Sequence, residues 1–150
     1  HTNMSLFKDG KNAFFDPAGE LQLSDTAYSF ISGVLKHVAG ITAVTNPLVN
    51  SYKDLYLGYE APCYIAWSAS NRTDIIRIPA SRGAGTRVEL RNPDPTTNPY
   101  LCLACCLAAG MDGIKNNLPA PDSVDVTYSS LLRKKEMLLV LELPGSLYEA

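Results

Sequence analysis

The segment from residue 98 to residue 115 constrains the fold most strongly, because it joins a helix start to a long uncharged stretch. Asn98 followed by Pro99 is a strong start signal, since asparagine caps the first turn and proline suits the first helical position. The run from Leu101 to Met111 is apolar or small throughout, yet well short of the roughly 20 residues that cross a bilayer. The pattern predicts a helix that is apolar nearly all round and therefore buried in a globular domain.

The remaining patterns predict a sheet and a second helix. Ser24 can cap a helix whose apolar residues recur at helical spacing from Ala27 to Val38, with Gly40 as its expected end. Residues 1–15 read as a hairpin around a turn at 8–11, and residues 45–58 read as an irregular loop. Strands are predicted over 63–68, 75–78 and 86–91, and a short amphipathic helix over 131–143. Together they predict one α+β domain, an antiparallel sheet backed by helices.

Charge and cysteine content argue against some partners and against a zinc site. Lys and Arg number 13 against 15 Asp and Glu, so the net charge of -2 offers no field to attract nucleic acid or an anionic membrane. On a helix Cys102 and Cys106 share a face while Cys105 points elsewhere, and no second C-x-x-C or histidine pair completes a zinc site. We interpret the cysteines as free core thiols in a reducing compartment. The chain opens without a signal peptide, so we expect the cytoplasm.

The stretch 87–91 carries the clearest chemical pattern. On a strand Arg87, Glu89 and Arg91 point one way, while Val88 and Leu90 point the other. A solvated edge strand would show the same ladder, with each exposed pair worth less than about 1 kcal/mol. The second interpretation is a binding face.

The neighbouring arginines favour the binding face. Three more precede the stretch: Arg72, Arg77 and Arg82. A carboxylate among several arginines suits a site where a divalent cation bridges phosphate oxygens and guanidinium groups bind the remaining charge. His1 and Asn3 point the same way if the first strand is regular, so that His1 could share a metal with Glu89. A frayed terminus is the alternative for His1.

Eight short motifs, in order and spacing, resemble the catalytic domain of type I glutamine synthetases over nearly the whole chain. They are HTNMSLF (1–7), TNPLVNSYK (45–53), GYEAP (58–62), SNR (70–72), IRIP (76–79), RVELR (87–91), DPTTNPY (94–100) and GMDGIK (110–115). In that family ATP phosphorylates the side-chain carboxylate of glutamate, and ammonia displaces phosphate from the acyl phosphate. The resemblance implies ATP, glutamate and ammonium as substrates, Mg²⁺ or Mn²⁺ as the metal, and a ring-shaped homo-oligomer with active sites shared between subunits.

The resemblance also implies a role for individual residues. His1 and Glu89 are expected to ligate the metal; Asn3, Arg72, Arg77 and Arg87 to face the nucleotide; Asn46, Asn50, Ser51, Glu60 and Arg91 to face glutamate. Arg72 and Glu60 are expected to be catalytic, Arg72 at the transferred phosphoryl group and Glu60 as the residue that closes the site and helps form the ammonium pocket.

The chain departs from the family pattern in two respects. Asp54 stands where the family carries an arginine that faces the substrate, which reverses the charge there. The family's other metal-binding glutamates have no counterpart, so we expect residues 1–150 to be a partial catalytic domain truncated at both ends. Two interpretations stay open, a fragment of an active ligase that is inactive alone and a non-catalytic assembly or regulatory relative with a degraded glutamate site.

Overall fold

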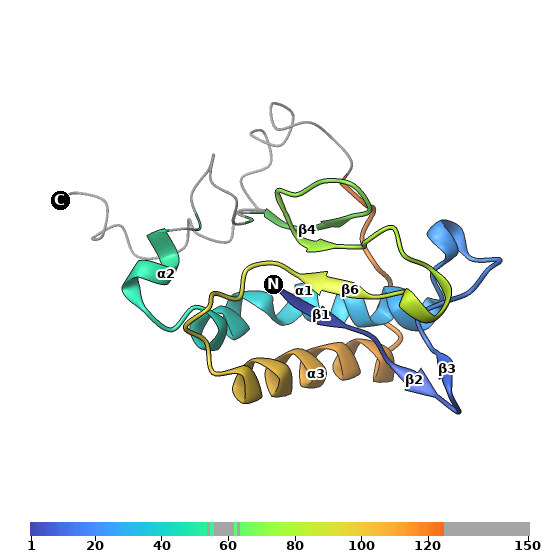
Figure 1. Ribbon diagram of the computed structural model, residues 1–150, viewed down its shortest axis with the longest axis horizontal. Coiled ribbons are helices and arrows are strands. Elements are labelled where there is room, and N and C mark those ends of the chain that lie inside the picture. The colour runs from blue at the N-terminus through green and yellow to red at the C-terminus, as the bar shows by residue number, and fades with distance from the viewer. Residues whose placement is uncertain (54, 56–61, 63, 125–150) are drawn as a thin grey trace.

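The computed structural model describes residues 1–53, 55, 62 and 64–124. It has two layers, with two long helices on one side of a four-stranded sheet (Figure 1). The strands are β1 (Thr2–Met4), β4 (Tyr64–Ser68), β5 (Asp74–Arg77) and β6 (Val88–Leu90). A separate two-stranded hairpin consists of β2 (Phe7–Lys8) and β3 (Lys11–Asn12). The helix–sheet arrangement confirms the predicted fold class.

The sheet order is β1-β6-β5-β4. The β1–β6 and β5–β6 pairs are antiparallel as expected, but β4 and β5 are parallel, so the sheet is mixed. Because Tyr64 pairs with Asp74, residues 69–73 have to bring the chain back to the start of β4 before β5 begins. Val88 and Leu90 are fully buried, which confirms the apolar face predicted for this strand.

The N-terminal prediction is partly right. The turn at 8–11 joins β2 to β3, and Asp9 and Gly10 take the positive φ angles of 52° and 76° that such a hairpin turn requires. Residues 2–4, however, leave this hairpin and pair with β6 in the main sheet. The pairing of β1 with β6 brings the N-terminus beside Glu89.

Helix α1 (Asp25–Thr45) begins at the predicted cap, where the Ser24 side chain accepts from the amide of Ala27. The expected end at Gly40 is wrong, since the helix continues to Thr45. An added Cβ at Gly40 would meet no atom of the described residues within 4 Å outside its own stretch of helix. Helix α2 (Val49–Lys53) interrupts the predicted irregular loop. By length and composition α1 could cross a membrane, but half of its apolar stretch is buried inside the domain, as in an ordinary core helix.

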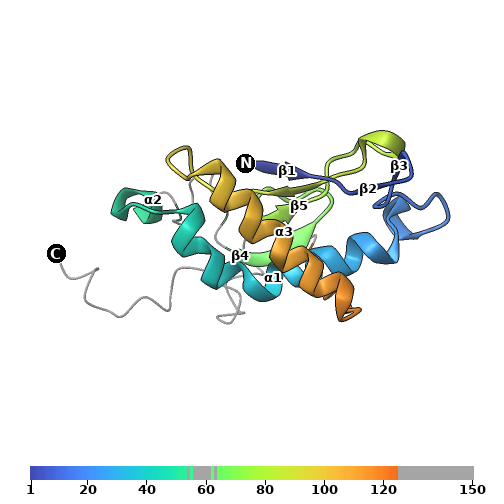
Figure 2. The ribbon, with the colours of Figure 1, turned by 90° about the horizontal axis from the view of Figure 1, so that it is seen from below.

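Helix α3 (Pro99–Lys115) confirms its predicted start, with the Asn98 side chain accepting from two backbone amides. The two helices cross closely (Figure 2). An added Cβ at Gly33 would lie 2.2 Å from the carbonyl oxygen of Ala109. The prediction that α3 is completely buried was wrong, because Leu103 and Leu107 are each 50% exposed.

Candidate functional site

The candidate site is a row of polar side chains that crosses the sheet on the face opposite Val88 and Leu90. Glu89 of β6 pairs with Asn3 of β1 on one side and with Arg77 of β5 on the other. Residues directly opposite on antiparallel strands project to the same face. The register therefore brings together three residues that the sequence analysis had selected from three separate motifs.

Glu89 is the centre of this row. Its side chain is 8% exposed, and Arg77 Nε donates to Glu89 Oε2 at 2.5 Å. Arg91 Nε lies 3.9 Å from the same oxygen, within ion-pair distance but beyond a hydrogen bond. No hydrogen bond to the other oxygen, Oε1, is found among the described residues. A carboxylate that is this deeply buried needs such cationic partners to stay charged.

Arg91 connects three parts of the chain. Its Nη1 donates to the carbonyl of Arg72 in the β4–β5 connection, and its Nη2 lies 3.3 Å from His1 Nε2. The backbone carbonyl of Arg91 also lies 3.0 Å from His1 Nδ1. Burial lowers the pKa of the Arg91 guanidinium, and the nearby Glu89 carboxylate opposes that shift. One side chain thus brings the N-terminus, β6 and the Arg72 segment together.

The other three arginines near this row differ in the contacts that hold their side chains. Arg87 Nε donates to Asn3 Oδ1 at 3.0 Å, so these two predicted nucleotide-side residues are in contact. The Arg72 side chain is exposed. Arg82 is engaged elsewhere, because its guanidinium donates to the carbonyls of Leu21, Pro79 and Ser81. Arg82 is therefore not part of the cluster around Glu89.

Asn71 shapes the segment before β5 and so positions Arg72, a role that was not predicted from the sequence. Asn71 Oδ1 accepts from the amide and the hydroxyl of Thr73, at 3.0 and 2.8 Å. The Asn71 amide donates to Ser68 Oγ at 2.9 Å. These local bonds shape a compact turn that leaves the Arg72 side chain directed outward. An asparagine in a short polar segment is the sequence signal that could have predicted this turn.

Asn46 and Ser51, both predicted on the glutamate side, face inward in this structure. Asn46 is 1% exposed; its Nδ2 donates to the carbonyl of Asn92 at 2.8 Å and its Oδ1 accepts from Thr45 Oγ1 at 2.8 Å. Ser51 is 2% exposed and accepts from the amide of Leu48. Asn46 ties the start of the 46–53 segment to the chain just after β6, whereas the bond from Leu48 to Ser51 lies within the segment.

Asp94 completes this anchoring. Its backbone amide donates to the carbonyl of Thr45, and its side chain bonds Ser51 and Thr96. Partial burial alone would raise the pKa of Asp94, but the hydrogen bonds outweigh burial and lower it. Asn50, the third predicted residue of this segment, is exposed. Glu60 and Asp54 lie outside the described residues.

His1 and Glu89 fit a divalent cation as part of its ligand set. Mg²⁺ and Mn²⁺ prefer oxygen ligands and accept an occasional imidazole, and Glu89 Oε1 and one His1 ring nitrogen are suitable donors. Within the part of the chain that the structure describes, no group of three or more His, Cys, Asp or Glu residues is placed to hold a metal. The remaining ligands would have to come from elsewhere.

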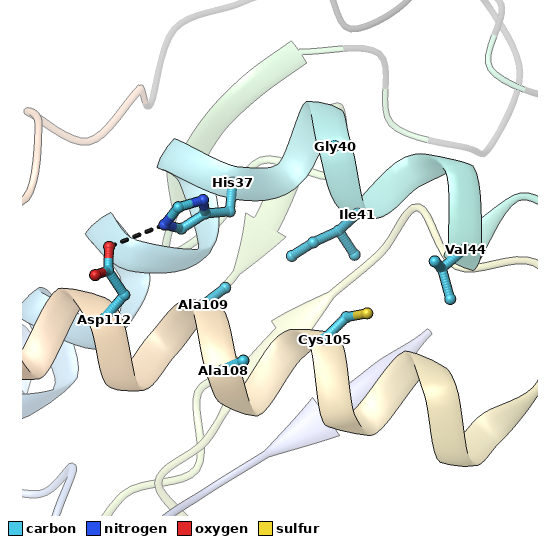
Figure 3. A pocket seen from close by; sticks show the side chains of 8 residues that line it. All are labelled: His37, Gly40, Ile41, Val44, Cys105, Ala108, Ala109 and Asp112. Atoms are coloured by element: carbon cyan, nitrogen blue, oxygen red, sulfur yellow. Dashed lines mark hydrogen bonds and ion pairs between the residues drawn. The ribbon is translucent and has the colours of Figure 1, made fainter.

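A hollow lies between α1 and α3, away from this row (Figure 3). Its apolar wall includes Ile41, Val44 and Cys105, and at one end His37 Nε2 lies 2.9 Å from Asp112 Oδ2. Hydrogen bonds from His37 and from Lys36 lower the pKa of the Asp112 carboxyl. These contacts link the two helices, and none of the residues that make them is a predicted site residue.

The fold and the row around Glu89 define a mixed α/β domain that presents a buried carboxylate between guanidinium groups, the kind of face that binds phosphates and a divalent cation. Comparison with known proteins specifies the family. The family model described as glutamine synthetase, catalytic domain, matches residues 1–150, and the chain belongs to this family.

Curated relatives agree with this assignment. The chain is 60% identical over 151 aligned residues to a glutamine synthetase of Clostridium saccharobutylicum and, equally, to one of Thermus thermophilus. A glutamine synthetase of Staphylococcus epidermidis is 55% identical over the same length. Each alignment covers all of this chain but 34% of the relative. The chain thus spans about a third of the length of these curated relatives.

Proposed function

We propose that this chain supplies the nucleotide, metal and glutamate contacts of an ATP-dependent glutamate–ammonia ligase. The reaction would make glutamine through a γ-glutamyl phosphate. The observation that carries the proposal is the carboxylate of Glu89 between Arg77 and Arg91, with His1 bound to Arg91. The identity to glutamine synthetases over the whole chain supports it.

In this proposal His1 and Glu89 would hold Mg²⁺ or Mn²⁺, and the metal would supply positive charge against the phosphates of ATP. The nucleotide side consists of the residues that lie around this pair: Asn3, Arg72, Arg77 and Arg87. Phosphoryl transfer needs cationic groups around the oxygens of the moving group. The exposed Arg72 side chain, on a turn fixed by Asn71, is suited to that contact.

The glutamate side is proposed to include Asn50, Glu60 and Arg91. Asn46 and Ser51 also belong to it, but their inward hydrogen bonds favour a supporting role, in which they fix the backbone beside Arg91. Arg91 is 8% exposed, so contact with a substrate carboxylate would require its guanidinium to turn outward.

We further propose that residues 1–150 are part of a larger catalytic domain, that the complete protein forms a homo-oligomer with shared active sites, and that it works in the cytoplasm. The chain alone would bind Mg·ATP weakly and make no glutamine. The exposed apolar side of α3, including Leu103 and Leu107, supports the first statement, because charged residues normally cover a surface helix.

The binding test compares the chain with two variants by equilibrium dialysis against Mg·ATP. Arg72→Met should lower affinity about tenfold or more, since it removes a charge-assisted contact to phosphate. Lys8→Met, on the exposed β2 strand, changes net charge equally and should leave affinity within about twofold. Equal affinities for all three proteins would refute the assignment of Arg72.

Asp54 favours the second candidate, a non-catalytic assembly or regulatory relative. The full-length protein that contains this sequence should make glutamine from ATP, glutamate and ammonia if it is a ligase. If the unaltered protein shows no turnover and Asp54→Arg restores it, the protein is a damaged enzyme. Absence of turnover in both indicates the non-catalytic relative.

A further inference from the structure

The Arg91 guanidinium contacts both residues that the proposed function assigns to the metal. Its Nη2 lies 3.3 Å from His1 Nε2, and its Nε lies 3.9 Å from Glu89 Oε2. The group is also buried, with its side chain 7% exposed. A cation that belongs to the chain itself therefore joins the two ligands.

The two contacts of the His1 ring define its tautomer. The backbone carbonyl of Arg91 can only accept, so His1 Nδ1 must carry the proton in the 3.0 Å bond. A guanidinium can only donate, so His1 Nε2 must accept from Arg91 Nη2. The lone pair of Nε2 is the one that a metal would use, because Nδ1 is already protonated. Guanidinium and metal thus require the same lone pair.

We propose that Arg91 substitutes for the divalent cation in the metal-free chain, and that Mg²⁺ or Mn²⁺ displaces its guanidinium from His1 on binding. The inference rests on the proposed function, since it takes His1 and Glu89 as metal ligands. It adds that Arg91 is a positioning residue, which holds the two ligands together until the metal arrives.

Two features of Arg91 make the displacement feasible. Its Nε is buried without a hydrogen-bond partner among the described residues, so the guanidinium satisfies the pocket incompletely. A divalent cation beside Glu89 would also repel both Arg91 and Arg77, the two cations already on that carboxylate. Because Arg91 Nη1 also binds the carbonyl of Arg72, its release would loosen the turn that presents the Arg72 side chain. Metal binding would thereby free a guanidinium for a substrate carboxylate.

The first test needs no variant. Nitrogen-15 NMR of the chain should show His1 Nε2 as the unprotonated ring nitrogen, and Mg²⁺ should shift this signal together with the Arg91 side-chain signals. EDTA should reverse both changes. Arg91 signals that stay unchanged while Mg²⁺ shifts His1 would overturn the proposal, because the guanidinium would then not be displaced.

The second test measures Mn²⁺ affinity by electron paramagnetic resonance, without nucleotide. Arg91→Met should bind Mn²⁺ about tenfold more tightly than the unaltered chain, since the competing cation is gone. Lys8→Met, with the same charge change on β2, should bind within about twofold of the unaltered chain. Weaker binding by Arg91→Met would overturn the proposal and show that Arg91 only supports the site.

Glu89→Gln separates this inference from the proposed function. Loss of Mn²⁺ binding in Glu89→Gln supports the metal site itself. If Glu89→Gln binds as well as the unaltered chain, the metal assignment fails and the inference fails with it. If Glu89→Gln loses binding while Arg91→Met gains none, the metal site stands and only the role of Arg91 is refuted.

Discussion

The crossing of α1 and α3 gives a sharp test of the fold. An added Cβ at Gly113 would lie 1.9 Å from the Ser29 carbonyl oxygen and 2.7 Å from the Gly33 amide nitrogen, and both are backbone atoms. Ordinary contact begins at 3.4 Å, so the helices would have to separate by about 1.5 Å at this point. A gap of even about 0.5–1 Å forfeits a quarter to a half of the contact energy across a packed surface. We expect Gly113→Ala to separate the two helices.

The expected change in the free energy of unfolding follows from two opposing terms. Alanine in place of glycine stabilises a helix by about 1 kcal/mol, whereas overpacking against backbone costs about 1–3 kcal/mol or more. Because the clashing atoms cannot rotate away, the second term should dominate, and Gly113→Ala should lose about 2 kcal/mol. Urea unfolding followed by circular dichroism measures the loss as a lower midpoint at unchanged slope.

Gly40→Ala is the matched control, since Gly40 lies inside α1 and its added Cβ would meet no other described part of the chain within 4 Å. It should be stabilising by up to about 1 kcal/mol, from helix propensity alone. If Gly113→Ala is as stable as Gly40→Ala, the close crossing of α1 and α3 is refuted.

Three further predictions concern other elements. Because the folded pKa of Asp94 is lowered, its stabilisation should be complete above the unfolded value of about 3.9 and should be lost as pH falls through the folded pKa. Asp94→Asn should remove this loss from the acid side of the urea-midpoint profile, and an unchanged profile would contradict the reasoning. Leu103→Gln should reduce self-association in sedimentation velocity, because this side chain is half exposed; an equal association state would refute the role of that surface. Iodoacetamide at pH 8 should label the half-buried Cys105 before Cys106, whose pKa burial raises to about 12, and equal rates in peptide mapping would refute the described packing.

Local signals predicted the ends of elements well where one side chain determines them. Ser24 and Asn98 cap the two long helices as expected, since each supplies an oxygen to amides that lack partners. Gly40 was misread because glycine weakens a helix by only about 1 kcal/mol, and packing of the neighbouring turns outweighs that cost. The parallel β4–β5 pair could not be predicted, since pairing direction depends on the whole path of residues 69–73.

The site shows the same limit. Alternation along one strand placed Arg87, Glu89 and Arg91 on a common face, but only the register of three strands shows that Arg77 binds Glu89 most closely. Asn46 is polar and belongs to a functional motif, so sequence alone could not show that its amide is used inside the domain. Asn71 was overlooked because its partners are local and its function acts through Arg72.

The most direct test of the central claim is paramagnetic broadening of the chain's backbone NMR signals by Mn·ATP. The proposed function predicts broadening around the row on the outer sheet face, at His1, Asn3 and Glu89, while Lys115 at the far end of α3 keeps its line width. Broadening confined to α3, or absent at saturating Mn·ATP, would contradict the claim that this face of the sheet binds the metal and the nucleotide.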